Sequence, residues 1–178
     1  TTSLIIQDMK ILLGSNSPRR RELLSGLNIP YTIVHTECDE HFPADLQGED
    51  IPRYICQEKA DAYKALLQED EVLITADTIV WLDGTMLGKP KDKADAKRML
   101  RLLSGRTHQV YTAISLTTSH SQETLSDRTD VIFKHLTEDE IEYYVEKYLP
   151  LDKAGAYGVQ EWIGYVGVEK TVGSFYNV

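Results

Sequence analysis

Short apolar runs alternate with segments of helical periodicity along the whole 178-residue chain. Runs rich in β-branched, aromatic and aliphatic residues predict strands at residues 10–15, 31–34, 71–88, 108–119, 124–136 and 163–170. The run at 71–88 is expected to form two or three strands, with a hairpin turn at Asp83–Gly84. The adjoining runs at 108–119 and 124–136 are expected to pair with each other.

Capping residues and apolar spacing predict helices between these strands. They are expected at residues 18–24, from about 52 to 67, from Asp92 to Gly105, and after Thr137, which forms a capping box with Glu140. Residues 150–162 form a glycine-rich loop. Because strands and helices interleave without a repeat or a low-complexity linker, the sequence predicts a single α/β or mixed α+β domain over 1–178, with room for two lobes.

Composition narrows the class of protein. Hydrophobic residues make up 42% and charged residues 26%, as in ordinary soluble domains, and no apolar run is long enough to span a membrane. Residues 1–10 lack the basic region and apolar segment of a secretory signal, so a cytoplasmic protein is expected. Two cysteines and five histidines without metal-motif spacing give neither a disulfide framework nor a zinc site. A net charge of −9 argues against nucleic acid as a partner, so any anion site must be local.

Three consecutive arginines, Arg19, Arg20 and Arg21, follow the helix start at Ser17–Pro18. A helix N-terminus carries partial positive charge and disfavours cations. One interpretation is a site for a polyphosphate, where free N–H groups and guanidinium groups act together. The alternative is that the side chains extend into solvent and tolerate a penalty of roughly 0.3–1 kcal/mol each.

Two charged residues fall within apolar patterns. Asp77 interrupts a run fit for a central strand, where an acid is costly unless it is paired or bound to a metal; the alternative is a strand-end aspartate that caps a turn. Lys59 lies on the apolar stripe of its predicted helix, so its ammonium group either snorkels to the edge or points into a cleft.

Three further positions complete a set suited to phosphate chemistry. Lys89, within Gly88–Pro90, is a candidate phosphate donor, and Glu40 is a candidate metal ligand together with Asp77, with a solvated surface position as its alternative. Gln160 either reads the edge of a base or stabilises its loop. Clustered cations and acids indicate a metal-assisted hydrolase, or a binder, of a phosphate-rich small molecule. No P-loop, kinase set or nucleophile elbow is present.

The ordered motifs "GSNSPRRRELL", "EKA", "ADTIV", "GKP", "LSGRTHQVYTAIS", "DKAGAYGVQ" and "VGSFYNV" resemble the Maf family of nucleoside triphosphate pyrophosphatases, also known as septum formation inhibitors. The resemblance covers residues 11–178. It implies an ITPase-like fold with a cleft between two lobes around a long mixed sheet. It also implies cleavage between the α- and β-phosphates with Mg²⁺ or Mn²⁺, and a homodimer.

The resemblance assigns roles to matching residues. Asp77 corresponds to the proton acceptor, and Glu40 to an acid of the metal and catalytic region that it shares with Asp77. The phosphate-contacting set is Ser15, Arg19, Arg20, Lys59 and Lys89. Arg19, Thr78 and Gln160 match the Arg, Thr and Gln of the subgroup that acts on dTTP and UTP, rather than the Trp, Gln and Glu of the subgroup that acts on 7-methyl-GTP.

The sequence departs from the family in three places. The family normally continues past the residues matching Val178 into a final helix, which is expected either to be absent or to lie outside this sequence. Gly14 stands where alanine is usual, and Glu161 stands where glycine is common. Two alternatives to a dTTP/UTP pyrophosphatase remain open at this stage. One is a nucleotide-sensing protein that inhibits septum formation without significant turnover, and the other is a house-cleaning hydrolase of modified nucleotides.

Overall fold

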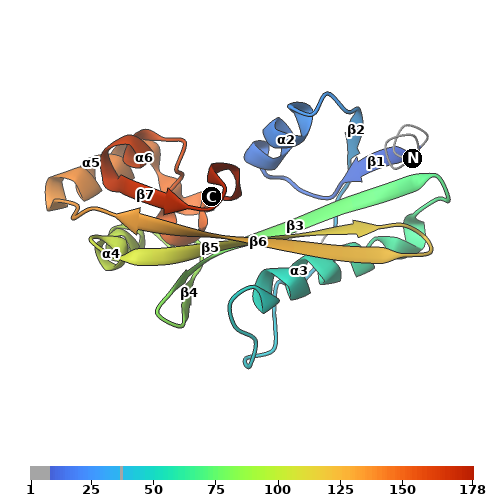
Figure 1. Cartoon of the computed structure of the whole chain (residues 1–178), viewed down its shortest axis with the longest axis horizontal. Coiled ribbons are helices and arrows are strands. Elements are labelled where there is room, and N and C mark those ends of the chain that lie inside the picture. Colours follow the sequence, from blue (N-terminus) through green and yellow to red (C-terminus); the bar gives the residue numbers. More distant parts are fainter. Residues whose placement is uncertain (1–8, 37) are drawn as a thin grey trace. The chain divides into compact units, whose positions relative to one another are not determined.

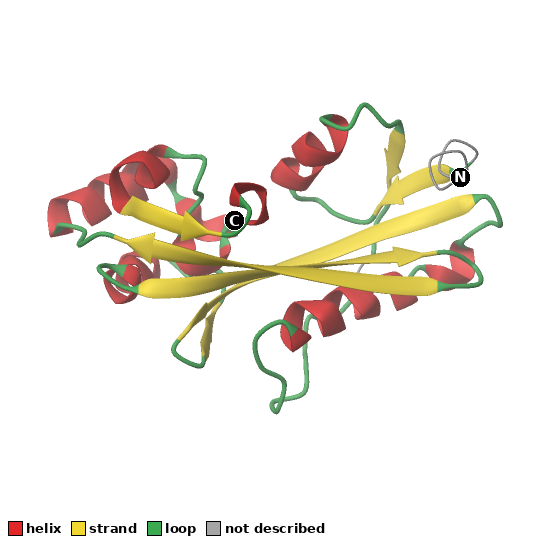
Figure 2. Cartoon of the chain, in the orientation of Figure 1, coloured by secondary structure: helices red, strands yellow, loops and turns green. Residues whose placement is uncertain are grey.

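The computed structural model describes residues 9–36 and 38–178 (Figure 1). Its described part contains a seven-stranded mixed sheet with the order β2-β1-β3-β5-β6-β7, and β4 pairs with β3. Helices and strands alternate along the chain (Figure 2), so the expected α/β class is confirmed. Residues 1–8, on which the expectation of no secretory signal partly rests, lie outside the described residues.

The elements have the following bounds. The strands are β1 (Lys10–Leu13), β2 (Tyr31–Ile33), β3 (Glu71–Leu82), β4 (Thr85–Leu87), β5 (Thr107–Thr117), β6 (Gln122–Phe133) and β7 (Val168–Val172). The α-helices are α2 (Pro18–Ser25), α3 (Asp50–Asp61), α4 (Lys93–Leu103), α5 (Glu138–Tyr148) and α6 (Trp162–Gly167). Short 3₁₀ turns are η1 (Lys64–Leu66), η2 (Pro150–Asp152), η3 (Ala154–Ala156) and η4 (Phe175–Asn177).

The chain forms two compact units. The first comprises the described residues up to Leu46 together with Asp50–Asp77 and Ala113–Ser126. In it β1 pairs in parallel with both β2 and β3, and Leu12 lies opposite Leu73. These two leucines pack with Ala60 of α3 in a small core, because α3 turns its apolar stripe toward the strands.

The second unit comprises Gln47–Glu49, Thr78–Thr112 and Asp127–Val178. It holds the larger core, in which α4, α5 and α6 bury their apolar faces against strand residues such as Val110, Val131 and Phe133. The predicted caps are confirmed: Asp92 accepts a hydrogen bond from the Asp95 amide at 2.8 Å, and Thr137 and Glu140 form the capping box.

One expectation about elements is wrong in part. The strand expected at residues 163–170 is confirmed only from 168 onward, in β7. Residues 163–167 belong to a helical turn, because Ile163 and Gly167 are buried at helical spacing while Tyr165 between them is exposed. Asp77 lies in the middle of one continuous strand of 12 residues, as the apolar run indicated, so the alternative of a strand-end aspartate is wrong. The sheet tolerates it because neighbouring cations face the carboxylate.

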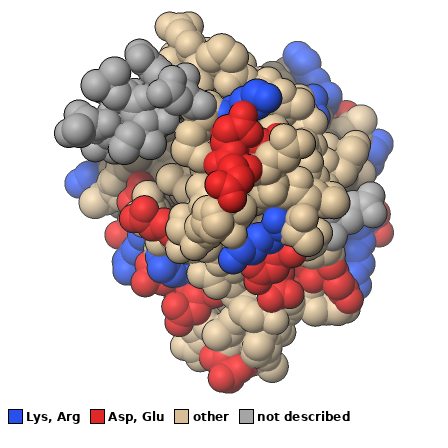
Figure 3. Space-filling view, turned by 90° about the vertical axis from the view of Figure 1, so that its right-hand side faces the viewer, with Lys and Arg blue, Asp and Glu red and all other residues tan. Residues whose placement is uncertain are grey.

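No helix in the described chain is long and apolar enough to cross a membrane. Figure 3 shows one face of the molecule, on which acidic and basic side chains are interspersed rather than gathered into one basic area.

Candidate functional site

Helix α2 begins as predicted and brings its arginines to the loop that precedes it. The Ser17 hydroxyl accepts a hydrogen bond from the Arg20 amide at 3.4 Å, and Pro18 occupies the first turn. The Arg20 guanidinium donates to the Ser15 hydroxyl at 3.3 Å, whereas Arg19 pairs with Glu22 at 3.2 Å. Burial lowers the pKa of Arg20, against the opposing effect of Asp77 and Glu40. The helix has no acidic residue in its first turn, so nothing there offsets the helix dipole.

Lys59 lies at the centre of an acid–cation cluster in the first unit. Its ammonium nitrogen is 3.2 Å from Glu40 Oε1 and 3.6 Å from Asp77 Oδ1, and it donates to the Ala76 carbonyl at 3.2 Å. The Lys59 and Asp77 side chains are each 13% exposed, whereas Glu40 is 58% exposed. Lys59 therefore points at two acids instead of snorkelling into solvent.

Asp77 is held in an environment that disfavours its charge. Burial raises its pKa from 3.8 to about 6, although Lys59 and Arg20 act in the opposite direction. Its Oδ2 atom is buried and has no hydrogen-bond partner among the described residues, while Oδ1 faces Lys59. A carboxylate with a pKa near neutrality and one unpartnered oxygen is suited to accept a proton.

The carboxylates of Glu40 and Asp77 are also the candidate metal ligands. Among the described residues no group of three or more His, Cys, Asp or Glu side chains can hold a metal ion by itself. Mg²⁺, however, is commonly bound by one or two carboxylates together with substrate phosphates and water. Glu40 and the unpartnered Oδ2 of Asp77 fit that pattern, with the remaining ligands supplied by the substrate.

The other expected site residues belong to the second unit. Thr112 donates its hydroxyl hydrogen to the Asn177 carbonyl at 3.2 Å, so Thr78 is the donor in its 2.9 Å contact with Thr112. Lys89 and Gln160 are both exposed, and within the described chain neither side chain makes a hydrogen bond or ion pair. The loop-stabilising alternative for Gln160 therefore has no support.

The glycine-rich loop and the segment that carries Lys89 are joined directly. The Gly155 amide donates to the Gly88 carbonyl at 3.1 Å. Gly155 has a φ of +71°, and a Cβ atom there would lie 2.8 Å from Val80, so only glycine fits. The sequence motifs at 88–90 and 152–160 are thus neighbours in the second unit.

Sequence analysis did not identify the polar role of Tyr144, a residue of α5. The Tyr144 hydroxyl donates to Glu161 at 2.9 Å and accepts from the Gly158 amide at 3.0 Å. A hydroxyl on a fully buried tyrosine needs a polar partner, and that requirement was the available signal.

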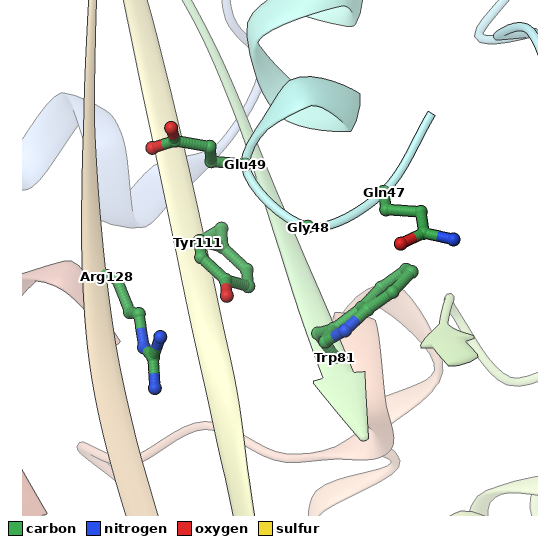
Figure 4. A pocket seen from close by; sticks show the side chains of 6 residues that line it. All are labelled: Gln47, Gly48, Glu49, Trp81, Tyr111 and Arg128. Atoms are coloured by element: carbon green, nitrogen blue, oxygen red, sulfur yellow. The ribbon is translucent and has the colours of Figure 1, made fainter. Parts of the chain in front are cut away.

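A separate concavity of about 480 Å³ lies within the second unit (Figure 4). It is lined by Gln47, Gly48, Glu49, Trp81, Tyr111 and Arg128. None of the site residues expected from the sequence lines it.

Comparisons with known proteins agree with the motif pattern. The family model described as "Maf-like protein" matches residues 10–178. The dTTP/UTP pyrophosphatase of Bacteroides thetaiotaomicron is 58% identical over 171 residues, covering 95% of this chain and 88% of that protein. The protein of the same name from Porphyromonas gingivalis is 52% identical over 178 residues, covering 97% and 88%. A solved structure of the Staphylococcus aureus Ham1 protein aligns with a TM-score of 0.48 at 18% identity, over 70% of this chain and 71% of that chain. The extent of the match and the level of identity show that this chain belongs to the Maf family.

Proposed function

We propose that this chain hydrolyses nucleoside triphosphates, dTTP and UTP above all, between the α- and β-phosphates. The products are the nucleoside monophosphate and pyrophosphate. The observation that carries the proposal is the Lys59 cluster, in which a desolvated Asp77 with one unpartnered oxygen faces an ammonium group. The close relatives named dTTP/UTP pyrophosphatase support the choice of substrate.

The chemistry follows from the charges. Ser15, Arg19, Arg20, Lys59 and Lys89 bind the triphosphate and offset its charge. Water attacks the α-phosphorus and transfers a proton to Asp77, while the bond from the α-phosphorus to the bridging oxygen breaks and pyrophosphate leaves with the electron pair. Glu40 and Asp77 would hold Mg²⁺ or Mn²⁺, which neutralises phosphate charge when bound.

This function also accounts for arginines at the start of α2. The triphosphate supplies the negative charge that the first helical turn lacks. Without substrate the site is electrostatically unfavourable, and binding relieves this. We assign base selection to Arg19, Thr78 and Gln160.

The nucleotide-sensing alternative uses the same cations but needs no proton acceptor. The raised pKa of Asp77 therefore favours an enzyme. Hydrolysis of modified nucleotides is a variant of the same reaction. A cytoplasmic location, a homodimer and a role in septum formation are further proposals that rest on the family.

Product analysis tests the function. The protein is incubated with Mg²⁺ or Mn²⁺ and, separately, with dTTP, UTP, 5-substituted pyrimidine nucleotides, CTP, ATP or 7-methyl-GTP. Pyrophosphate and monophosphate from dTTP and UTP are expected, and Asp77→Asn should bind nucleotide without turnover. Release of orthophosphate, or binding without turnover by the unmodified protein, would overturn the proposal. Faster turnover of the 5-substituted nucleotides would favour the house-cleaning variant.

A further inference from the structure

The short turn η4 near the end of the chain is tied to the sheet by the side chain of Asn177. Its Nδ2 group donates to the Val110 carbonyl at 3.1 Å and to the Thr129 hydroxyl at 2.8 Å. Val110 belongs to β5 and Thr129 to β6, which are neighbouring strands, and both residues are buried. One amide group therefore connects η4 to two strands and holds the backbone of this turn beside them.

The direction of the hydrogen bonds around Asn177 follows from counting hydrogens. A carbonyl oxygen can only accept, so the Val110 carbonyl requires the N–H end of the Asn177 amide. Thr129 donates its one hydroxyl hydrogen to the Ser174 carbonyl at 3.0 Å, so it also accepts from Asn177. In this orientation Asn177 Oδ1 is buried without a partner among the described residues, which costs free energy. The amide therefore serves this position through its N–H groups.

The same counting extends the network to Thr78 of β3. Thr112 of β5 donates its only hydroxyl hydrogen to the backbone carbonyl of Asn177 at 3.2 Å. Its 2.9 Å contact with Thr78 must then use the Thr78 hydrogen. The Asn177 carbonyl thus determines, through Thr112, where the Thr78 hydrogen points.

The direction of a hydroxyl hydrogen matters for reading a base. A hydroxyl group that can rotate suits either a donor or an acceptor. Uracil and thymine present a ring N–H beside a carbonyl, whereas cytosine presents a ring nitrogen lone pair beside an amino group. A rotating hydroxyl group therefore distinguishes these bases poorly, while one whose hydrogen is committed elsewhere can only accept.

We propose that Asn177 is a positioning residue for base selection, because through Thr112 it commits the Thr78 hydrogen to the sheet and makes Thr78 an acceptor toward the base. The inference rests on the proposed function and on the assignment of Thr78 to base selection. Gly173 lets the segment before η4 pass close to β6, since a Cβ atom there would lie 2.9 Å from the Arg128 carbonyl. The motif "VGSFYNV" thus has a part in base selection.

The test compares kcat/KM for UTP and CTP, which carry the same triphosphate. Thr112→Val is nearly isosteric but removes the acceptor for the Thr78 hydrogen. It should lower the UTP-to-CTP ratio by about three- to tenfold, the factor that corresponds to one net hydrogen-bond preference. Thr112→Ser keeps the hydroxyl group and should keep the ratio. Asn177→Leu releases η4 and should lower the ratio to a similar extent. Thr107→Val, at an exposed threonine of the same strand, is the matched control and should leave the ratio unchanged.

Two double-mutant cycles show whether the effect passes along the network. In a Thr112→Val background, Asn177→Leu should change the ratio no further. In a Thr78→Val background, Thr112→Val should likewise have no additional effect on the ratio. A purely structural role would lower kcat/KM for both nucleotides together and would leave their ratio as it was.

The outcomes separate the inference from the proposed function. If the unmodified protein releases no pyrophosphate from UTP or dTTP, the proposed function fails. If it hydrolyses UTP without preferring it to CTP, or if Thr112→Val keeps the full ratio at an unchanged melting temperature, only the inference fails. An undiminished effect of Asn177→Leu in the Thr112→Val background would also overturn the inference, because Asn177 would then not act through Thr112. Should Asn177→Leu not fold, Asn177→Ala takes its place in the cycle.

Discussion

Replacing Asp77 by asparagine should abolish turnover and at the same time stabilise the protein. In the folded protein burial raises the Asp77 pKa to about 6 from 3.8, its value in a solvated chain. Ionising this group therefore costs more in the folded state than in the unfolded state. At about 1.36 kcal/mol per pKa unit, the difference of 6 − 3.8 corresponds to about 3 kcal/mol. Asparagine avoids this cost because it is neutral and nearly isosteric.

The gain in stability must depend on pH. Below about pH 3.8 Asp77 is protonated in both states, so the variant and the unmodified protein should have similar free energies of unfolding. As pH rises, the unfolded state ionises first and the unmodified protein loses relative stability. The full gain of about 3 kcal/mol is reached above about pH 6.

Urea denaturation at several pH values between 4 and 8 measures this gain. The protein is kept free of divalent ions, since a bound ion would favour the ionised carboxylate. Taking the difference between the two proteins removes the contribution of other titrating groups, such as His108. Asp70→Asn is the matched control, because the Asp70 side chain is 49% exposed and its ion pair is with the exposed Lys10. The reasoning would be refuted if the gain in free energy of unfolding of Asp77→Asn over the unmodified protein were no larger at pH 8 than at pH 4. Normal turnover by Asp77→Asn would refute it as well.

Three other predictions test the cation, the loop and the buried histidine. Lys59→Met should lower kcat/KM for dTTP by about 10²–10³-fold, the usual cost of losing one charge-stabilising donor, whereas Lys10→Met should leave steady-state kinetics unchanged. Gly155→Ala should lower the free energy of unfolding, measured by urea denaturation, by about 2–4 kcal/mol, since both backbone strain and a clash with Val80 oppose the new Cβ atom. Gly84 has a similar φ of +81° but open space around the position of a Cβ atom, so Gly84→Ala should lower it by only about 1 kcal/mol. Burial lowers the pKa of His108 to about 4 from 6.5, so stability relative to His108→Phe should fall by about 3 kcal/mol as pH drops from 6.5 to 4; a pH-independent difference would show that His108 does not titrate in this way.

Local features of this protein were predictable from the sequence alone. The caps at Ser17, Asp92 and Thr137 satisfy amide groups only three residues further on, so the information lies within one helical turn. The hairpin at Asp83–Gly84 is equally local, because both residues adopt positive φ. The ordered motifs were sufficient to identify the family.

Contacts between distant segments were decided only by the tertiary structure. The direction of the Lys59 side chain depends on Asp77, which is 18 residues further along, and helical spacing alone left its ammonium group free to snorkel. The raised pKa of Asp77 requires burial of its carboxylate among distant segments, which its position in an apolar run does not by itself establish. Residues 163–170 were expected to form a strand, but the packing of Ile163 and Gly167 favours a helical turn up to residue 167. The position of Glu161 over Gly158 likewise depends on Tyr144 from another helix. Residue type and spacing therefore determined the local elements and the family, whereas the burial, charge and orientation of the site residues arose from long-range packing.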